Sequence, residues 1–199
     1  MSKEIILYHG TTESKLPYIL RDGIQPSNAT GKPNYKAWTP GCSSWVYLTD
    51  TWPLHYSING VSSQVDAGLP VVIKISIKTK HLYPDEDFLG EVLFLQKCLT
   101  ERQSGTPMEM VTEFIKLEDN IAEARRRLYR FKWMWENSLQ LQGCVACKYV
   151  DPNTILDYVM IADEAKLTPF RDISPCSKEK GLRGIELRTL TEKLFEVML

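Results

Sequence analysis

The segment that most constrains this chain is residues 5–12, with the sequence IILYHGTT. A short apolar run closed by a glycine predicts a buried strand, Ile5–Tyr8, whose end delivers polar groups to a site. Gly10 lets the backbone approach another molecule closely. The imidazole of His9 and the hydroxyl of Thr11 can hydrogen-bond to ribose hydroxyls and a carboxamide. We therefore expect a binding site at the end of this first strand.

A second strand is predicted over Val46–Leu48, at a distance along the chain that lets it lie beside the first. Because side chains alternate across a strand, Tyr47 faces the side opposite to its two neighbours. A short helix is predicted over Trp52–Asn59, and it carries Tyr56. Two tyrosines so placed can form a stacking surface for a flat heteroaromatic ring. The alternative is that both are ordinary core aromatics.

The rest of the chain alternates between strand and helix patterns, which predicts an α+β class and a single domain over residues 1–199. Further strands are expected over Val71–Ile77, Gln142–Cys147 and Ile155–Ile161. Helical periodicity is expected over Glu13–Arg21, ended by Gly23; in an insertion at about 89–139; and in a tail at about 184–199. Residues 25–44 are expected to form a long surface loop, and Asp50 and Thr51 are expected to cap the helix that follows them.

The charge balance gives little support to a dedicated nucleic-acid binder. The net charge is −1 and the pI is about 6.3, so no strong basic field is available to hold a duplex. A local cluster remains in the insertion, at Arg125–Arg127, Arg130 and Lys132, with Trp133 and Trp135 nearby. This cluster is either a solvated helix face or a patch that binds single-stranded nucleic acid by charge and stacking.

The five cysteines are irregularly spaced, no secretory segment precedes the first strand, and no apolar run approaches the roughly 20 residues that a membrane span needs. We therefore expect a cytoplasmic protein with reduced thiols and no membrane partner. Cys144 and Cys147 form a CxxC pair without a second pair to complete a zinc set. Core packing is the favoured interpretation, and no metal is expected.

Several of these segments, in this order, resemble the ADP-ribosyltransferase superfamily of the diphtheria-toxin and poly-ADP-ribose polymerase type. The segments are His9-Gly10-Thr11, residues 19–24 (ILRDGI), residues 46–50 (VYLTD) and Tyr56. Their order is also similar to the NAD-binding half of RNA 2′-phosphotransferases. The resemblance covers residues 5–77 well and 140–161 loosely. It implies a split β core, interrupted here by the helical insertion, and NAD as a substrate.

The resemblance also implies a role for each matching residue. His9 would bond an adenosine-side ribose hydroxyl of NAD. The backbone of Gly10 would bond the nicotinamide carboxamide, with Thr11 assisting. Tyr47 would stack on the nicotinamide ring, and Tyr56 would close its other side.

A carboxylate is expected to stabilise the oxocarbenium-like ribose that forms when NAD is cleaved. In the family this acid lies at or just before the strand that we place at Gln142–Cys147. Glu136 is the first choice on chemistry, because only a carboxylate carries negative charge. Gln142 is the better match in position, and Asp85 and Asp87 are outside candidates.

The resemblance predicts a mono-ADP-ribosyltransferase that releases nicotinamide from NAD and modifies a macromolecule, either nucleic acid or protein. Small solitary members are often bacterial toxins, effectors or phage proteins, so a neutralising protein partner is expected by analogy. One alternative is a catalytically degenerate module that binds NAD, ADP-ribose or a protein partner. Another is an enzyme similar to RNA 2′-phosphotransferases.

Overall fold

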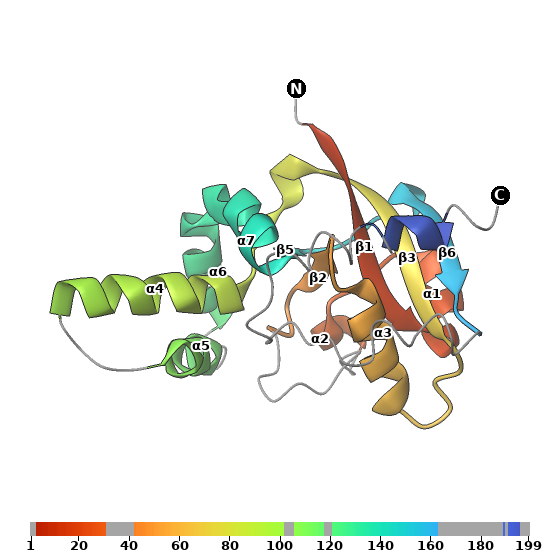
Figure 1. The fold of residues 1–199 in the computed structure, drawn as a ribbon, viewed down its shortest axis with the longest axis horizontal. Coiled ribbons are helices and arrows are strands. Elements are labelled where there is room, and N and C mark those ends of the chain that lie inside the picture. Colours follow the sequence, from red (N-terminus) through yellow and green to blue (C-terminus); the bar gives the residue numbers. More distant parts are fainter. Residues whose placement is uncertain are drawn as a thin grey trace.

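The computed structural model describes residues 3–30, 42–101, 106–117, 121–162, 189 and 191–195, and it contains both strands and helices (Figure 1). Its strands form one antiparallel sheet in the order β4-β5-β2-β1-β3-β6. The strands are β1 (Glu4–Thr12), β2 (Val46–Thr49), β3 (Pro70–Lys78), β4 (Tyr83–Pro84), β5 (Cys144–Cys147) and β6 (Ile155–Met160). The α+β class expected from the sequence is therefore present.

The helices divide into two groups in space. They are α1 (Leu16–Asp22), α2 (Ser27–Thr30), α3 (Pro53–Ser62), α4 (Glu86–Glu101), α5 (Pro107–Lys116), α6 (Ile121–Arg130) and α7 (Trp135–Gln142). Short 3₁₀ turns occur at Glu13–Lys15, Thr79–His81, Lys132–Met134 and Pro152–Thr154. Helices α4 to α7 gather at one end of the molecule, and α1 and α3 lie near β1 and β3 at the other (Figure 1). The expected helical insertion is therefore present, with wider bounds.

The two longest strands, β1 and β3, pair along their whole length, from Glu4 opposite Lys78 to Thr12 opposite Pro70. Our prediction that the first strand ends at Tyr8 is therefore wrong. The strand continues because β3 supplies backbone partners for all four following residues, and because β-branched threonines suit a strand. Thr11 and Thr12 are fully buried.

Pairing between the two halves of the sheet is sparse. Strands β1 and β2 are paired only at Tyr8 and Thr49, whereas β2 and β5 pair over four consecutive positions. Beyond that single position the two central strands no longer form a ladder. His9 follows directly after Tyr8 on β1, so it lies where the two strands diverge, and its ring reaches the Tyr47 carbonyl of β2.

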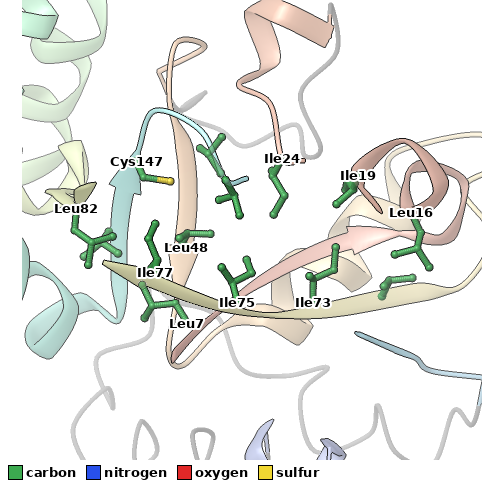
Figure 2. Packing of buried hydrophobic residues seen from close by; sticks show 14 residues of the cluster. Leu7, Leu16, Ile19, Ile24, Leu48, Ile73, Ile75, Ile77, Leu82 and Cys147 are labelled. Carbon is green, nitrogen blue, oxygen red and sulfur yellow. The ribbon is translucent and has the colours of Figure 1, made fainter. Parts of the chain in front are cut away.

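The apolar residues form separate clusters on the two faces of the sheet. Figure 2 shows the first cluster, which includes Leu7, Leu48 and Ile75 of the sheet together with Leu16 and Ile19 of α1. The second lies on the other face with α3, and there Phe195 stacks on Tyr8 with ring centroids 5.6 Å apart.

A third cluster lies under the helical insertion. Cys147 belongs to the first cluster and Cys144 to the second, so the CxxC pair packs in the core as predicted. Of the expected terminal helix at 184–199, residues 189 and 191–195 are described, and they are helical. The rest of that segment, and residues 31–41 of the expected long loop, lie outside the described residues.

Two local predictions are wrong. The strand expected from Gln142 begins at Cys144 instead, because Gly143 has a left-handed backbone (φ 76°) that ends α7 after Gln142. Helix α3 is not capped by Asp50 or Thr51, and its N-cap residue is Trp52. None of the described helices is long and apolar enough to span a membrane.

Candidate functional site

The imidazole of His9 lies where β1 and β2 diverge. Its Nδ1 is 3.0 Å from the backbone carbonyl oxygen of Tyr47, which can only accept, so Nδ1–H is the donor. Burial lowers the pKa of His9 to about 4, and the nearby Lys15 ammonium acts in the same direction. At neutral pH the ring is therefore uncharged. Because Nδ1 carries the proton, Nε2 is an acceptor.

Gly10 is packed against helix α3. A Cβ at this position would overlap the Pro53 carbonyl oxygen and would lie 2.7 Å from the Ser57 nitrogen and 2.9 Å from the Tyr56 Cβ. We expected this glycine to make room for another molecule, but in the structure its close neighbour is α3. The glycine is needed here because the first turns of the helix lie directly on the strand. This contact also places Tyr56 beside the HGT segment.

Tyr47 extends to the other side of its strand and meets a carboxylate that the sequence analysis did not select. Its hydroxyl lies 2.5 Å and 2.6 Å from the two carboxylate oxygens of Glu86, the first residue of α4. The backbone N–H of Cys42 donates to the same carboxylate, at 2.7 Å, and to the tyrosine hydroxyl oxygen, at 2.8 Å. These three groups join β2, the start of α4 and the segment that leads into β2.

Burial determines the electrostatics of this junction. Glu86 is 1% exposed, and its burial, together with the negative charge of Asp87, raises its pKa to about 7. Burial and the carboxylates of Glu86 and Asp85 raise the pKa of Tyr47 well above its usual value. The phenol therefore stays protonated and donates to the carboxylate.

Tyr56 lies close to the same acidic run from the side of α3. Its hydroxyl is 3.2 Å from the Sγ of Cys144 on β5. Burial raises the pKa of Tyr56, and the charges of Asp85 and Asp87 add to the shift. After burial, the Asp85 charge is among the causes that raise the pKa of both Tyr47 and Tyr56.

The hydrogen bonds of Ser138 hold the acidic run in position. The Ser138 hydroxyl accepts from the backbone N–H of Asp85 at 2.9 Å and donates to the Cys144 carbonyl at 2.8 Å. Asp85 in turn accepts from the N–H of Asp87 at 3.2 Å, as residues at a helix N-terminus commonly do. Burial and the neighbouring carboxylates raise the pKa of Asp85 well above its usual range.

The structure places the two predicted candidates for the acid on α7. Glu136 is exposed in the first turn of the helix. Gln142 is the last residue of α7, and its side chain donates to a carboxylate oxygen of Glu91 at 3.0 Å. Its carbonyl accepts from the Trp52 indole at 2.8 Å, which ties this end of α7 to the start of α3.

The structure thus brings Tyr47 into contact with His9 and with Glu86, a residue that the sequence analysis did not select. The available signal was the run of three acidic residues directly after Tyr83-Pro84 and at the start of a helical pattern. We kept only Asp85 and Asp87 of this run, as outside candidates. In the structure, Asp85 and Glu86 are buried, and burial raises the pKa of both, which favours their neutral forms. Asp87 is exposed, so its carboxylate is the member of the run that can stabilise positive charge.

Comparison with known proteins adds no functional assignment, because no protein-family model matches the chain and no curated protein matches it significantly. Within the part of the chain that the structure describes, no group of three or more His, Cys, Asp or Glu side chains is placed to hold a metal ion.

Proposed function

We propose that this protein is a mono-ADP-ribosyltransferase that cleaves NAD at the nicotinamide bond and transfers ADP-ribose to a macromolecule. The observation that carries the proposal is the hydrogen bond from His9 Nδ1–H to the Tyr47 carbonyl. It joins two residues of the resemblance that lie 38 positions apart in the chain. It also orients the imidazole with Nε2 as the acceptor, which suits a bond from a ribose hydroxyl.

The tyrosines support a nicotinamide site in the same region. Tyr47 and Tyr56 are both partly buried, and both are influenced by the charge of Asp85. A partly buried aromatic ring offers a flat surface against which a heteroaromatic ring can stack. The contact between Gly10 and α3 fixes the distance between the HGT segment and Tyr56.

The site offers two sources of the negative charge that an oxocarbenium-like ribose requires. One is Asp87, the exposed carboxylate of the acidic run, which follows the Glu86 that contacts Tyr47. The other is Glu136, which is exposed and has the chemistry expected from the resemblance. Glu136→Gln and Asp87→Asn replace one exposed carboxylate each. The variant that loses NAD turnover while keeping its thermal stability identifies the source.

The experiment that tests the proposal is incubation of the purified protein with labelled NAD and cell lysate, followed by protease or nuclease digestion. Label in protein or in nucleic acid is the expected result, and it also names the class of acceptor. His9→Ala should abolish labelling, and Tyr18→Phe, on the exposed face of α1, should leave it unchanged. Undiminished labelling by a folded His9→Ala variant would refute the proposal.

One observation favours a second candidate, a module that binds NAD or ADP-ribose without turnover. The Glu86 carboxylate is already engaged by the Tyr47 hydroxyl and the Cys42 N–H, which is typical of a structural pair rather than a reacting acid. Under this alternative, NAD would raise the melting temperature of the protein, and no nicotinamide would be released with lysate present.

A further inference from the structure

An open depression of about 470 Å³ lies where the helical insertion meets the residues that follow β3, apart from the contacts of His9 and Tyr47. Its walls come from the turn after β3, from α6, from the turn at 132–134 and from α7. The lining residues are Thr79, Lys80, Tyr129, Lys132, Trp133 and Trp135. Half of them are aromatic and two are lysines, so the depression combines flat apolar surface with positive charge.

The aromatic surface is exposed to solvent. Trp133 is 69% exposed and Tyr129 is 42% exposed. The Tyr129 ring is held from behind, because its edge packs on Tyr83 with ring centroids 5.3 Å apart. A fixed, exposed aromatic surface of this kind marks a contact site more often than it serves the fold.

Positive charge surrounds these rings. The Lys132 ammonium lies 4.4 Å from the centre of the Tyr83 ring and donates to the Lys80 carbonyl, and Lys148 lies 5.0 Å from the centre of the Tyr129 ring. Lys80 itself is exposed. Near this turn, burial and then the charges of Lys80, Lys132 and Lys78 lower the pKa of His81.

The arginine run that the sequence analysis selected contributes less than expected. Arg126 pairs with Glu123 at 2.7 Å, and Arg127 is 3.6 Å from the same carboxylate. Two of the three consecutive arginines are therefore partly neutralised. The positive charge at the depression comes instead from lysines on other elements, which lie far apart in the sequence.

We propose that this depression binds single-stranded nucleic acid, with a base stacked on Trp133 and backbone phosphates beside Lys80 and Lys132. Exposed aromatic faces beside cations match unpaired bases joined by phosphates. A duplex does not fit this pattern, because its bases already stack on one another. That the bound strand also receives ADP-ribose rests on the proposed function.

The test is fluorescence anisotropy of 5′-fluorescein-labelled dT12 and U12 with the full chain, from 50 to 300 mM NaCl and without NAD. Trp133→Ala should weaken binding by about five- to a hundred-fold, the range that loss of one base–aromatic stack produces. Lys80→Gln should reduce the slope of log K against log salt by about 0.7, the value of one phosphate contact to a single strand.

Matched controls come from exposed residues at the other end of the molecule (Figure 1). Tyr18→Ala removes a 62% exposed aromatic on α1, and Lys193→Gln removes an exposed lysine near the C-terminus. Both should bind as the unaltered protein does. A poly-aspartate peptide of twelve residues should compete weakly, because it carries charge without bases.

Four results would overturn the proposal. They are no binding of dT12 or U12 at 50 mM salt, binding by Trp133→Ala as tight as by the unaltered protein, binding of a labelled dT12–dA12 duplex as tight as that of dT12, or competition by poly-aspartate as strong as that by unlabelled dT12. Because the assay contains no NAD, its result is separate from that of the proposed function. Binding without any ADP-ribosyl transfer refutes the enzyme and leaves the nucleic-acid site standing. If Trp133→Ala transfers ADP-ribose to nucleic acid at the unaltered rate, the nucleic-acid site is refuted and the enzyme stands.

Discussion

The hydroxyl of Tyr47 lies within 2.6 Å of both carboxylate oxygens of Glu86, which is 39 positions later in the chain. A phenol that donates to a buried carboxylate stabilises that carboxylate, and the carboxylate holds the ring at one angle. The pair therefore couples the orientation of a predicted nicotinamide-stacking residue to the start of α4.

A double-mutant cycle should measure the coupling between Tyr47 and Glu86. Tyr47→Phe removes only the hydroxyl, and Glu86→Gln keeps the shape while removing the charge. We expect Tyr47→Phe to lose about 1–3 kcal/mol of unfolding free energy, because it leaves a buried carboxyl without its donor. Glu86→Gln should lose less, because burial already disfavours the charged form and the amide oxygen can still accept from the hydroxyl. The double variant should lose less than the sum of the two. Urea unfolding measures all four proteins, and strict additivity would contradict the contact.

The pH dependence of stability should carry a signature of Glu86. Its pKa rises from 4.5 to about 7 on folding, so the native state holds a proton that the unfolded chain releases. The resulting stabilisation is fully present below pH 4.5 and is lost as the pH rises through about 7. Relative to Glu86→Gln, the unaltered protein should therefore lose stability between these values, by about 1–3 kcal/mol. Melting curves of both proteins from pH 4 to 8 give their difference in stability at each pH. A difference that does not change with pH would count against the burial of this carboxyl.

His9 should produce the opposite slope. Its pKa falls from 6.5 to about 4 on folding, so the unfolded chain binds the proton more readily. Its stabilising contribution is present above pH 6.5 and is lost as the pH falls through about 4. Relative to His9→Gln, the unaltered protein should gain about 1–3 kcal/mol of unfolding free energy as the pH rises from 4 to 6.5. An NMR titration of the imidazole checks this directly, and a pKa near 6.5 would refute it.

Substitution at Gly10 should disturb helix α3. Gly10→Ala places a methyl group against the Pro53 carbonyl and the Ser57 nitrogen, so the helix must shift. We expect a loss of about 1–3 kcal/mol of unfolding free energy, which is the usual cost of overpacking. Ser76→Ala, a partly exposed position on β3, is the control and should change stability by less than about 0.5 kcal/mol. Equal stability of the two variants would show that α3 does not lie on this glycine.

Periodicity along the chain predicted most of the regular elements. The apolar run at Val71–Ile77 and its partner at residues 5–8 lie in β3 and β1, because a strand between two layers must carry apolar residues on both faces. Spacings of three and four predicted the helices of the insertion, since an amphipathic helix buries one stripe. Gly23, with φ 77°, ends α1 as predicted.

The misplaced boundaries have a shared cause. β1 continues past Tyr8 and β5 begins after Gln142 because neighbouring strands and a left-handed Gly143 determine where pairing starts and stops. These are properties of the partners, and local composition does not contain them. The same holds for Gly10, whose close neighbour is determined by how α3 docks and not by the residues beside it.

By itself, the sequence determined that strands run through residues 5–8 and 46–48, and that the Tyr47 side chain lies on the face opposite to those of Val46 and Leu48. Only the tertiary structure decided that the His9 imidazole bonds the Tyr47 backbone and that the Tyr47 hydroxyl donates to Glu86. It also decided that Lys80 and Lys132 line one depression with Trp133, and that Lys148 lies over the Tyr129 ring. The physical reason is that side-chain alternation and helical period are local, whereas strand divergence, helix docking and the burial of a charge depend on contacts between distant segments.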